Sequence, residues 1–212
     1  MALAFETKAS VGILLPMLIV GDLFAVAYYR RKAIWKHLLV LIPWVLIGII
    51  IGFFVLDWSN NRILQVLIGV IVLILLFIHI VKSRLDERLE QMIDKARWFS
   101  PLLGVLAGFT TMIGNAAGGI MSIYLLSKRL DKTAFVGTGA WFFLFVNVIK
   151  VPFYLHLGLI SSETLIFNSW MVPAIVAGAV TGIFVLKRIP QTWFQRIVIA
   201  LTAIGAIRLI IV

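Results

Sequence analysis

The chain contains no cysteine, which excludes a disulfide scaffold and any metal site built from thiolates. Charged residues make up only 13% of its 212 positions, about half the share expected of a soluble domain. Polar runs are scarce as well, and the longest is the short stretch from Lys82 to Arg97. The phosphate-binding pattern G-x-x-x-x-G-K-[ST] does not occur, which argues against ATP-driven pumping by this chain. From these absences we predict that the protein is not an enzyme and that it binds no cofactor.

Hydrophobic residues, in contrast, account for 62% of the chain. A bilayer core of about 30 Å is crossed by about 20 helical residues, and several apolar runs are long enough. They are Ala9–Tyr29, His37–Leu56, Ile63–Val81, Ala134–Leu157, Leu165–Leu186 and Trp193–Ile211. We therefore predict an all-α, multi-pass integral protein of the cell (inner) membrane, with the lipid bilayer as a partner.

The net charge of +10 would also fit a nucleic-acid-binding protein, but the positions of the cations argue against that class. Fifteen of the nineteen Lys and Arg residues fall in four short clusters beside apolar runs. The connections 57–61 and 158–163 contain neither Lys nor Arg. This asymmetry is typical of cytoplasmic loops under the positive-inside rule. The distribution of the basic residues therefore predicts how the protein is oriented in the membrane. We expect no nucleic-acid partner.

One apolar segment, residues 98–128, contains too many Gly, Thr and Asn residues for an unbroken helix. We expect a broken hairpin whose arms, Trp98–Phe109 and Gly119–Leu126, flank a turn at Thr110–Gly118. Each arm is too short to cross a bilayer alone. A re-entrant hairpin keeps every basic loop on the cytoplasmic side and both chain termini outside. Two short full crossings would satisfy the same charge pattern.

The two halves of the chain also share a pattern. Pro43, Gly48, Gly52 and Gln65 recur 130 positions later as Pro173, Gly178, Gly182 and Gln195, and Gly12, Asp22 and Tyr29 recur 125 positions later as Gly137, Asn147 and Tyr154. Because the first and fourth apolar runs would cross in opposite directions, the pattern predicts inverted repeats of the kind found in secondary carriers. The expected division is a first repeat at 1–82, a cytoplasmic linker at 83–97 and a second repeat at 98–212.

Two further expectations follow from the repeat. The first repeat has no counterpart of the broken hairpin, so we expect about 30 residues to be missing at the amino end. Glycines four positions apart let helices approach closely in lipid. The helices containing Gly48 and Gly52, and Gly178 and Gly182, are therefore expected to be packing helices.

The broken segment is the first candidate site. The Thr110 and Thr111 hydroxyls, the Asn115 amide and the N–H groups near Gly114 and Gly118 would suit a small oxyanion. A helix amino end at the turn would add unpaired N–H donors and the positive end of the helix dipole. The alternative is that the glycines only allow close helix packing.

The second candidate site lies around Lys150, a cation well inside an apolar run. Charged residues within a membrane span commonly mark substrate or ion pathways, and Asn147 lies on the same helix face. Asp22 is the counter-ion of Lys150 in one interpretation and the acceptor of a coupling proton in another. The structural alternative is that Lys150 extends along its helix to the membrane surface.

The segments GFTTMIGNAAG, from Gly108, and GTGAWFF, from Gly137, resemble the TauE/SafE-type sulfite exporter family of membrane permeases, and the similarity covers nearly the whole chain. The resemblance implies a secondary transporter for small sulfur-containing anions, such as sulfite or organosulfonates. It also implies a Gly-rich segment ahead of Ala9 that is not found here. An anion channel and a non-transporting membrane scaffold are the alternatives. The pattern makes no prediction of oligomeric state.

Overall fold

The computed structural model describes residues 7–58, 61–82 and 98–211, and within these ranges its regular elements are helices. The elements are α1 (Thr7–Tyr29), the 3₁₀ helix η1 (Arg30–Lys32), α2 (Trp35–Trp58), α3 (Asn61–Lys82), α5 (Phe99–Gly114), α6 (Ala117–Ser127), α7 (Lys132–His156), α8 (Ser162–Arg188) and α9 (Gln191–Ile211). Every predicted apolar run forms a helix, which confirms the all-α prediction. The predicted linker at 83–97 and the predicted gap ahead of α1 lie outside the described residues.

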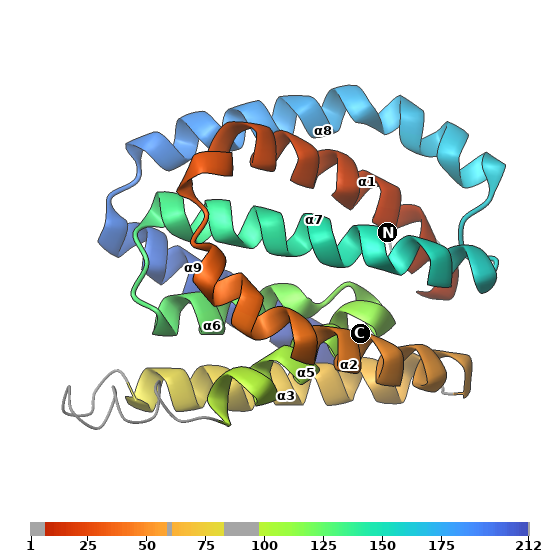
Figure 1. Ribbon diagram of the computed structural model, residues 1–212, viewed down its shortest axis with the longest axis horizontal. Coiled ribbons are helices and arrows are strands. Elements are labelled where there is room, and N and C mark those ends of the chain that lie inside the picture. Colours follow the sequence, from red (N-terminus) through yellow and green to blue (C-terminus); the bar gives the residue numbers. More distant parts are fainter. Residues whose placement is uncertain (1–6, 59–60, 83–97, 212) are drawn as a thin grey trace. The chain divides into compact units, whose positions relative to one another are not determined.

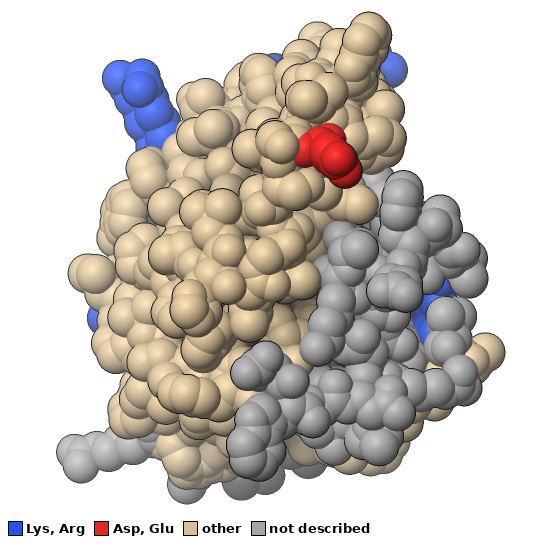
Figure 2. Space-filling model, turned by 90° about the vertical axis from the view of Figure 1, so that its right-hand side faces the viewer, with Lys and Arg blue, Asp and Glu red and all other residues tan. Residues whose placement is uncertain are grey.

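Among the residues that the structure describes, four helical stretches are long and apolar enough to cross a membrane. They are Val11–Lys32, Trp35–Leu56, Lys132–His156 and Ser162–Arg188. The face drawn in Figure 2 agrees with this assignment, because charged side chains on its described part are few and leave broad uncharged areas. The chain thus has the helices of a multi-pass membrane protein.

The helices form two compact units. The first contains α1, η1, α7 and α8, and the second contains α2, α3, α5, α6 and α9. Each unit takes helices from both halves of the sequence, so neither corresponds to one of the predicted repeats. The repeat boundaries remain predictions.

In the first unit, α1 packs against both α7 and α8 (Figure 1). Gly12, near the start of α1, lies against the Leu159 carbonyl just beyond the end of α7. Gly137, near the start of α7, lies against the end of α1, where an added Cβ would be 2.9 Å from the Tyr29 carbonyl oxygen. These contacts make α1 and α7 antiparallel neighbours, with a glycine at each end of their interface.

In the second unit, α2 and α5 approach each other through glycines on both helices. Gly48 of α2 lies against the Val105 backbone, and Gly108 of α5 lies against the Val45 backbone. Gly52 and Gly104 continue the contact, with added Cβ atoms 2.8 Å from Met112 Cβ and 2.6 Å from Trp44 Cβ, respectively. The prediction that α2 is a packing helix is confirmed.

The matching prediction for α8 is not met within the described residues. A Cβ added at Gly178 or Gly182 would meet nothing within 4 Å. The motif alone could not anticipate this difference, because close packing needs a partner helix as well as a small residue.

Candidate functional site

The break in the 98–128 segment falls at Asn115 and Ala116, between α5 and α6. Asn115 has a φ of 52° and lies in the left-handed region, where its N–H donates to the Thr111 carbonyl at 3.1 Å. The Ala116 N–H donates to the Thr110 carbonyl at 3.2 Å. Asn is among the few residues besides Gly that adopt this conformation readily at a helix end. The predicted break is confirmed, but it is narrower than expected because α5 continues to Gly114.

This continuation changes the position of the two threonines. Thr110 and Thr111 are buried inside the last turns of α5. The Thr110 hydroxyl donates to the Ala107 carbonyl of its own helix at 3.3 Å, a common arrangement for Thr in helices. Neither threonine lines the pocket described next.

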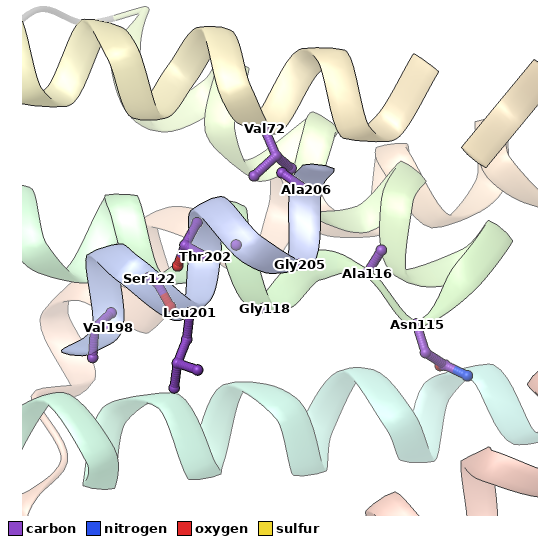
Figure 3. Close-up of a pocket in the computed structure, with 11 residues that line it drawn as sticks. Val72, Asn115, Ala116, Gly118, Ser122, Val198, Leu201, Thr202, Gly205 and Ala206 are labelled. Atoms are coloured by element: carbon purple, nitrogen blue, oxygen red, sulfur yellow. The ribbon is translucent and has the colours of Figure 1, made fainter. Parts of the chain in front are cut away.

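A pocket of about 380 Å³ lies beside the break, between the first turns of α6 and the middle of α9 (Figure 3). This volume is within the range of small-molecule sites. Its lining consists of Val72 from α3, Asn115, Ala116, Gly118, Gly119 and Ser122 at the break and on α6, and Val198, Leu201, Thr202, Gly205 and Ala206 on α9. Of the residues predicted at the turn, the structure brings Asn115 and Gly118 to this pocket and leaves Gly114 outside its lining.

The glycines at the start of α6 have different roles. Gly119 is required by packing, because an added Cβ would lie 2.8 Å from Val72 Cγ1. Packing does not require a glycine at position 118, because a Cβ added to Gly118 would meet nothing within 4 Å. Close helix packing therefore explains Gly119 but not Gly118, which leaves open space in the pocket.

The start of α6 is suited to hold an anion. Its N-cap residue, Ala116, has no side chain that could accept a hydrogen bond from the first turn. The first N–H groups of a helix have no partner within the helix, and they carry its positive dipole end. The 11-residue α6 therefore directs polar N–H donors toward the break.

Two hydroxyl-bearing residues of the lining, Ser122 and Thr202, were missed by the sequence analysis (Figure 3). Ser122 follows Gly118 by one helical turn, so its spacing could have revealed it. Thr202 lies in an apolar part of α9 with no local signal. In Figure 3 the Asn115 side chain points away from the α9 residues.

A second polar cluster is buried in the other unit, between α1 and α7. The Asn147 amide nitrogen donates to the Asp22 carboxylate at 2.7 Å. Lys150, one turn further along α7, is fully buried (0% exposed), and its ammonium lies 5.6 Å from the centre of the Tyr154 ring. Asn147 and Lys150 are three positions apart and share a face of α7, so Lys150 belongs to the cluster that contains Asp22. Lys150 thus lies in the interior of its unit rather than at the surface.

A comparison with known protein families matches residues 1–209 to the family described as Sulfite exporter TauE/SafE. The chain belongs to the TauE/SafE sulfite exporter family. Membership makes it a multi-pass membrane protein of a transporter family, not of an enzyme family, and implies a sulfur-containing anion as substrate. No curated protein and no solved structure matches the chain. Within the described residues of this TauE/SafE protein, no group of three or more His, Asp or Glu side chains could hold a metal.

Asn115 ends α5 in the left-handed conformation, and two substitutions test this backbone role. Asn115→Gly keeps the left-handed conformation accessible, whereas Asn115→Ala should destabilise the protein by about 1 kcal/mol. We expect Asn115→Gly to melt within about 1 °C of the wild type and Asn115→Ala about 2–4 °C lower. Thermal unfolding in detergent measures both, and equal melting temperatures would exclude the backbone role.

Proposed function

We propose that this protein is a secondary carrier that moves a small sulfur-containing anion by alternating access, and that the pocket at the start of α6 binds the anion. The observation that carries the proposal is Gly118, whose missing side chain leaves the first turn of α6 open to the pocket. The opening gives a small anion access to the N–H groups of that turn.

The pocket offers chemistry that suits an oxyanion. Free N–H groups of a first helical turn bind anions through several donors at once, and the hydroxyls of Ser122 and Thr202 add two further donors. The remaining walls are largely apolar, with Val72, Val198 and Leu201 among them. Apolar walls lower the local dielectric and strengthen each hydrogen bond to the anion.

Alternating access needs a device with two related conformations, and we propose the inverted repeat for this role. Three observations support it. Asp22 and Asn147, which are 125 positions apart and equivalent in the repeat, bond directly to each other. The Gly12 and Gly137 contacts at the two ends of the α1–α7 interface are reciprocal. A Cβ added at Gly119 would lie 2.8 Å from Val72 and 3.4 Å from Thr202, two residues that are 130 positions apart. Residues beside a pseudo-two-fold axis behave in this way.

In the same proposal, the cluster of Asp22, Asn147 and Lys150 controls charge within its unit. A lysine fully buried within a membrane span is rare and commonly marks a functional site. Lys150 balances the charge of Asp22, and a proton on Asp22 is the candidate coupling ion. We also propose that the α5–α6 hairpin is re-entrant. The two helices would extend only about 24 Å and 16 Å, which is less than the bilayer core of about 30 Å.

Counterflow in proteoliposomes tests the carrier mechanism. Vesicles loaded with unlabelled substrate should transiently concentrate labelled substrate from outside, because a carrier exchanges one molecule for another. We expect this overshoot with at least one of sulfite, sulfoacetate, taurine and sulfate. Vesicles loaded with chloride, and vesicles without protein, are the controls. Uptake that only reaches equilibrium without an overshoot would indicate a channel, and absence of uptake for all four would contradict the proposal.

A further inference from the structure

The chain passes between its two units three times, and each passage takes place between consecutive residues. The three crossings are Trp35 to Lys36, Asp131 to Lys132, and Pro190 to Gln191. Consecutive Cα atoms are only about 3.8 Å apart, so each crossing ties one point of the first unit to one point of the second. The movements open to the units therefore depend on where these points lie within each unit.

In the first unit, the GTGAWFF segment of α7 holds the first crossing. The Ile34 N–H donates to the Thr138 hydroxyl at 3.0 Å, and the ring centres of Trp35 and Trp141 are 4.9 Å apart. Thr138 is completely buried. The segment therefore anchors the chain at the point where it leaves this unit.

The other two crossings lie at the same end of the first unit. Lys132 is the first residue of α7, and its ammonium donates to the carbonyls of Lys187 and Ile189. Pro190 follows Ile189 directly. The end of α1, the start of α7 and the end of α8 accordingly lie at the left of this unit in Figure 1. All three crossings thus lie beside the first turns of α7.

The second unit gathers the same three crossings around the end of α6. The Tyr124 hydroxyl donates to the His37 carbonyl at 3.1 Å, which holds the start of α2. The Gln191 side-chain amide donates to the Leu130 carbonyl at 3.1 Å, which holds the start of α9 beside the chain that leads to α7. Each unit therefore brings all three of its connections to one place.

We propose that the three crossings form a hinge, and that the two units rock about it when the carrier changes conformation. The inference rests on the alternating access proposed above. If one unit slid past the other, the crossings would have to lengthen, and they contain no spare residue. The hydrogen bonds at Thr138, Lys132 and Gln191 also hold the chain beside them. Rotation keeps all three crossings short, and a few residues at helix ends can absorb it.

The hinge predicts where movement is largest. The 27-residue α8 ends at the hinge and the 21-residue α9 begins there, so they extend from it by about 40 Å and 31 Å, respectively. A rotation of about 15° moves a point about 30 Å from the hinge by about 8 Å. The far ends of the units should therefore move much more than the residues beside the crossings.

Distances between spin labels on the full chain in lipid nanodiscs test this proposal. The chain has no cysteine, so two labels can be placed at introduced cysteines and measured by double electron–electron resonance. Arg31→Cys with Thr192→Cys is the hinge pair, and Glu163→Cys with Phe54→Cys is the far pair. All four positions are exposed, and each pair has one label in each unit. The same cysteines recombine into controls within one unit, residues 31 with 163 and 54 with 192.

We expect the distance distribution of the far pair to be wider than those of the hinge pair and of both controls by about 5 Å or more. A far pair as narrow as the controls would show that the units do not move. A hinge pair as wide as the far pair would show sliding. Either result would overturn the proposal.

A further substitution tests whether the hydrogen bonds hold the hinge. Gln191→Leu removes the bond to Leu130, and we expect it to widen the hinge-pair distribution about twofold. Gln195→Leu, the same exchange one turn further along α9, is the control and should leave the distribution unchanged. An unchanged distribution in Gln191→Leu would overturn the role of this bond. No flux is measured, so a wide far pair without counterflow would contradict the proposed transport and leave the hinge supported.

Discussion

Replacing Lys150 by Met is expected to lower the melting temperature of the purified protein by about 5–10 °C and to reduce anion flux at least tenfold. Methionine preserves the length and flexibility of the side chain but removes the charge. Lys150 is fully buried, and Asp22, bonded to Asn147, would lose the positive charge that balances it. Removing one member of a buried charge pair costs about 3–5 kcal/mol, and somewhat less here because Asp22 is only half-buried.

A double variant separates the structural role of this pair from its role in transport. Asp22→Asn combined with Lys150→Met leaves neither charge unbalanced, so we expect the melting temperature to return to within about 3 °C of the wild type. Flux should remain low because the charged cluster is gone. A Lys150→Met protein with wild-type stability and flux would contradict both the stabilising role and the transport role of this cluster.

The second large effect is expected at the α2–α5 interface. Gly108→Leu should prevent α5 from reaching α2 and destabilise the protein by about 3 kcal/mol or more, because even a Cβ at this position would overlap the Val45 backbone. Backbone atoms cannot move aside as a flexible side chain can. We expect the variant to be recovered in low yield and to aggregate on size-exclusion chromatography in detergent.

Gly182→Leu is the matched control for this substitution. It introduces the same side chain into a helical glycine of an equivalent motif, but at a position where a Cβ meets nothing within 4 Å. We expect its yield and elution to match those of the wild type. Similar loss of folding in both variants would show that leucine is harmful for reasons other than the α2–α5 contact.

Much of this fold could be predicted because membrane helices are specified by length and hydrophobicity alone. The six apolar runs became α1, α2, α3, α7, α8 and α9, and the excess of Gly, Thr and Asn indicated the break near Asn115. The exact position of the break was harder to predict. Thr110 and Thr111 remain helical because a threonine hydroxyl can bond within its own helix.

The candidate site was only partly predictable, since it depends on contacts between distant segments. Asn115 and Gly118 were anticipated from local composition, whereas Thr202 reaches the pocket only because α9 packs beside α6. Gly178 and Gly182 show the same limit, because their spacing predicted a packing helix but a Cβ at either position meets nothing within 4 Å. A motif that allows close packing does not specify whether a partner helix is present.

Anion flux through a protein with a filled pocket tests the central claim most directly. Gly205 lines the pocket, and a Cβ there meets nothing within 4 Å, so Gly205→Phe should fold normally while its ring occupies the space needed by the anion. Ile204→Phe places the same ring at the neighbouring position, which is 61% exposed and outside the lining. We predict that Gly205→Phe loses at least about 90% of the flux seen with the wild type and with Ile204→Phe, at an unchanged melting temperature. Wild-type flux through a stable Gly205→Phe protein would contradict the assignment of this pocket as the anion site.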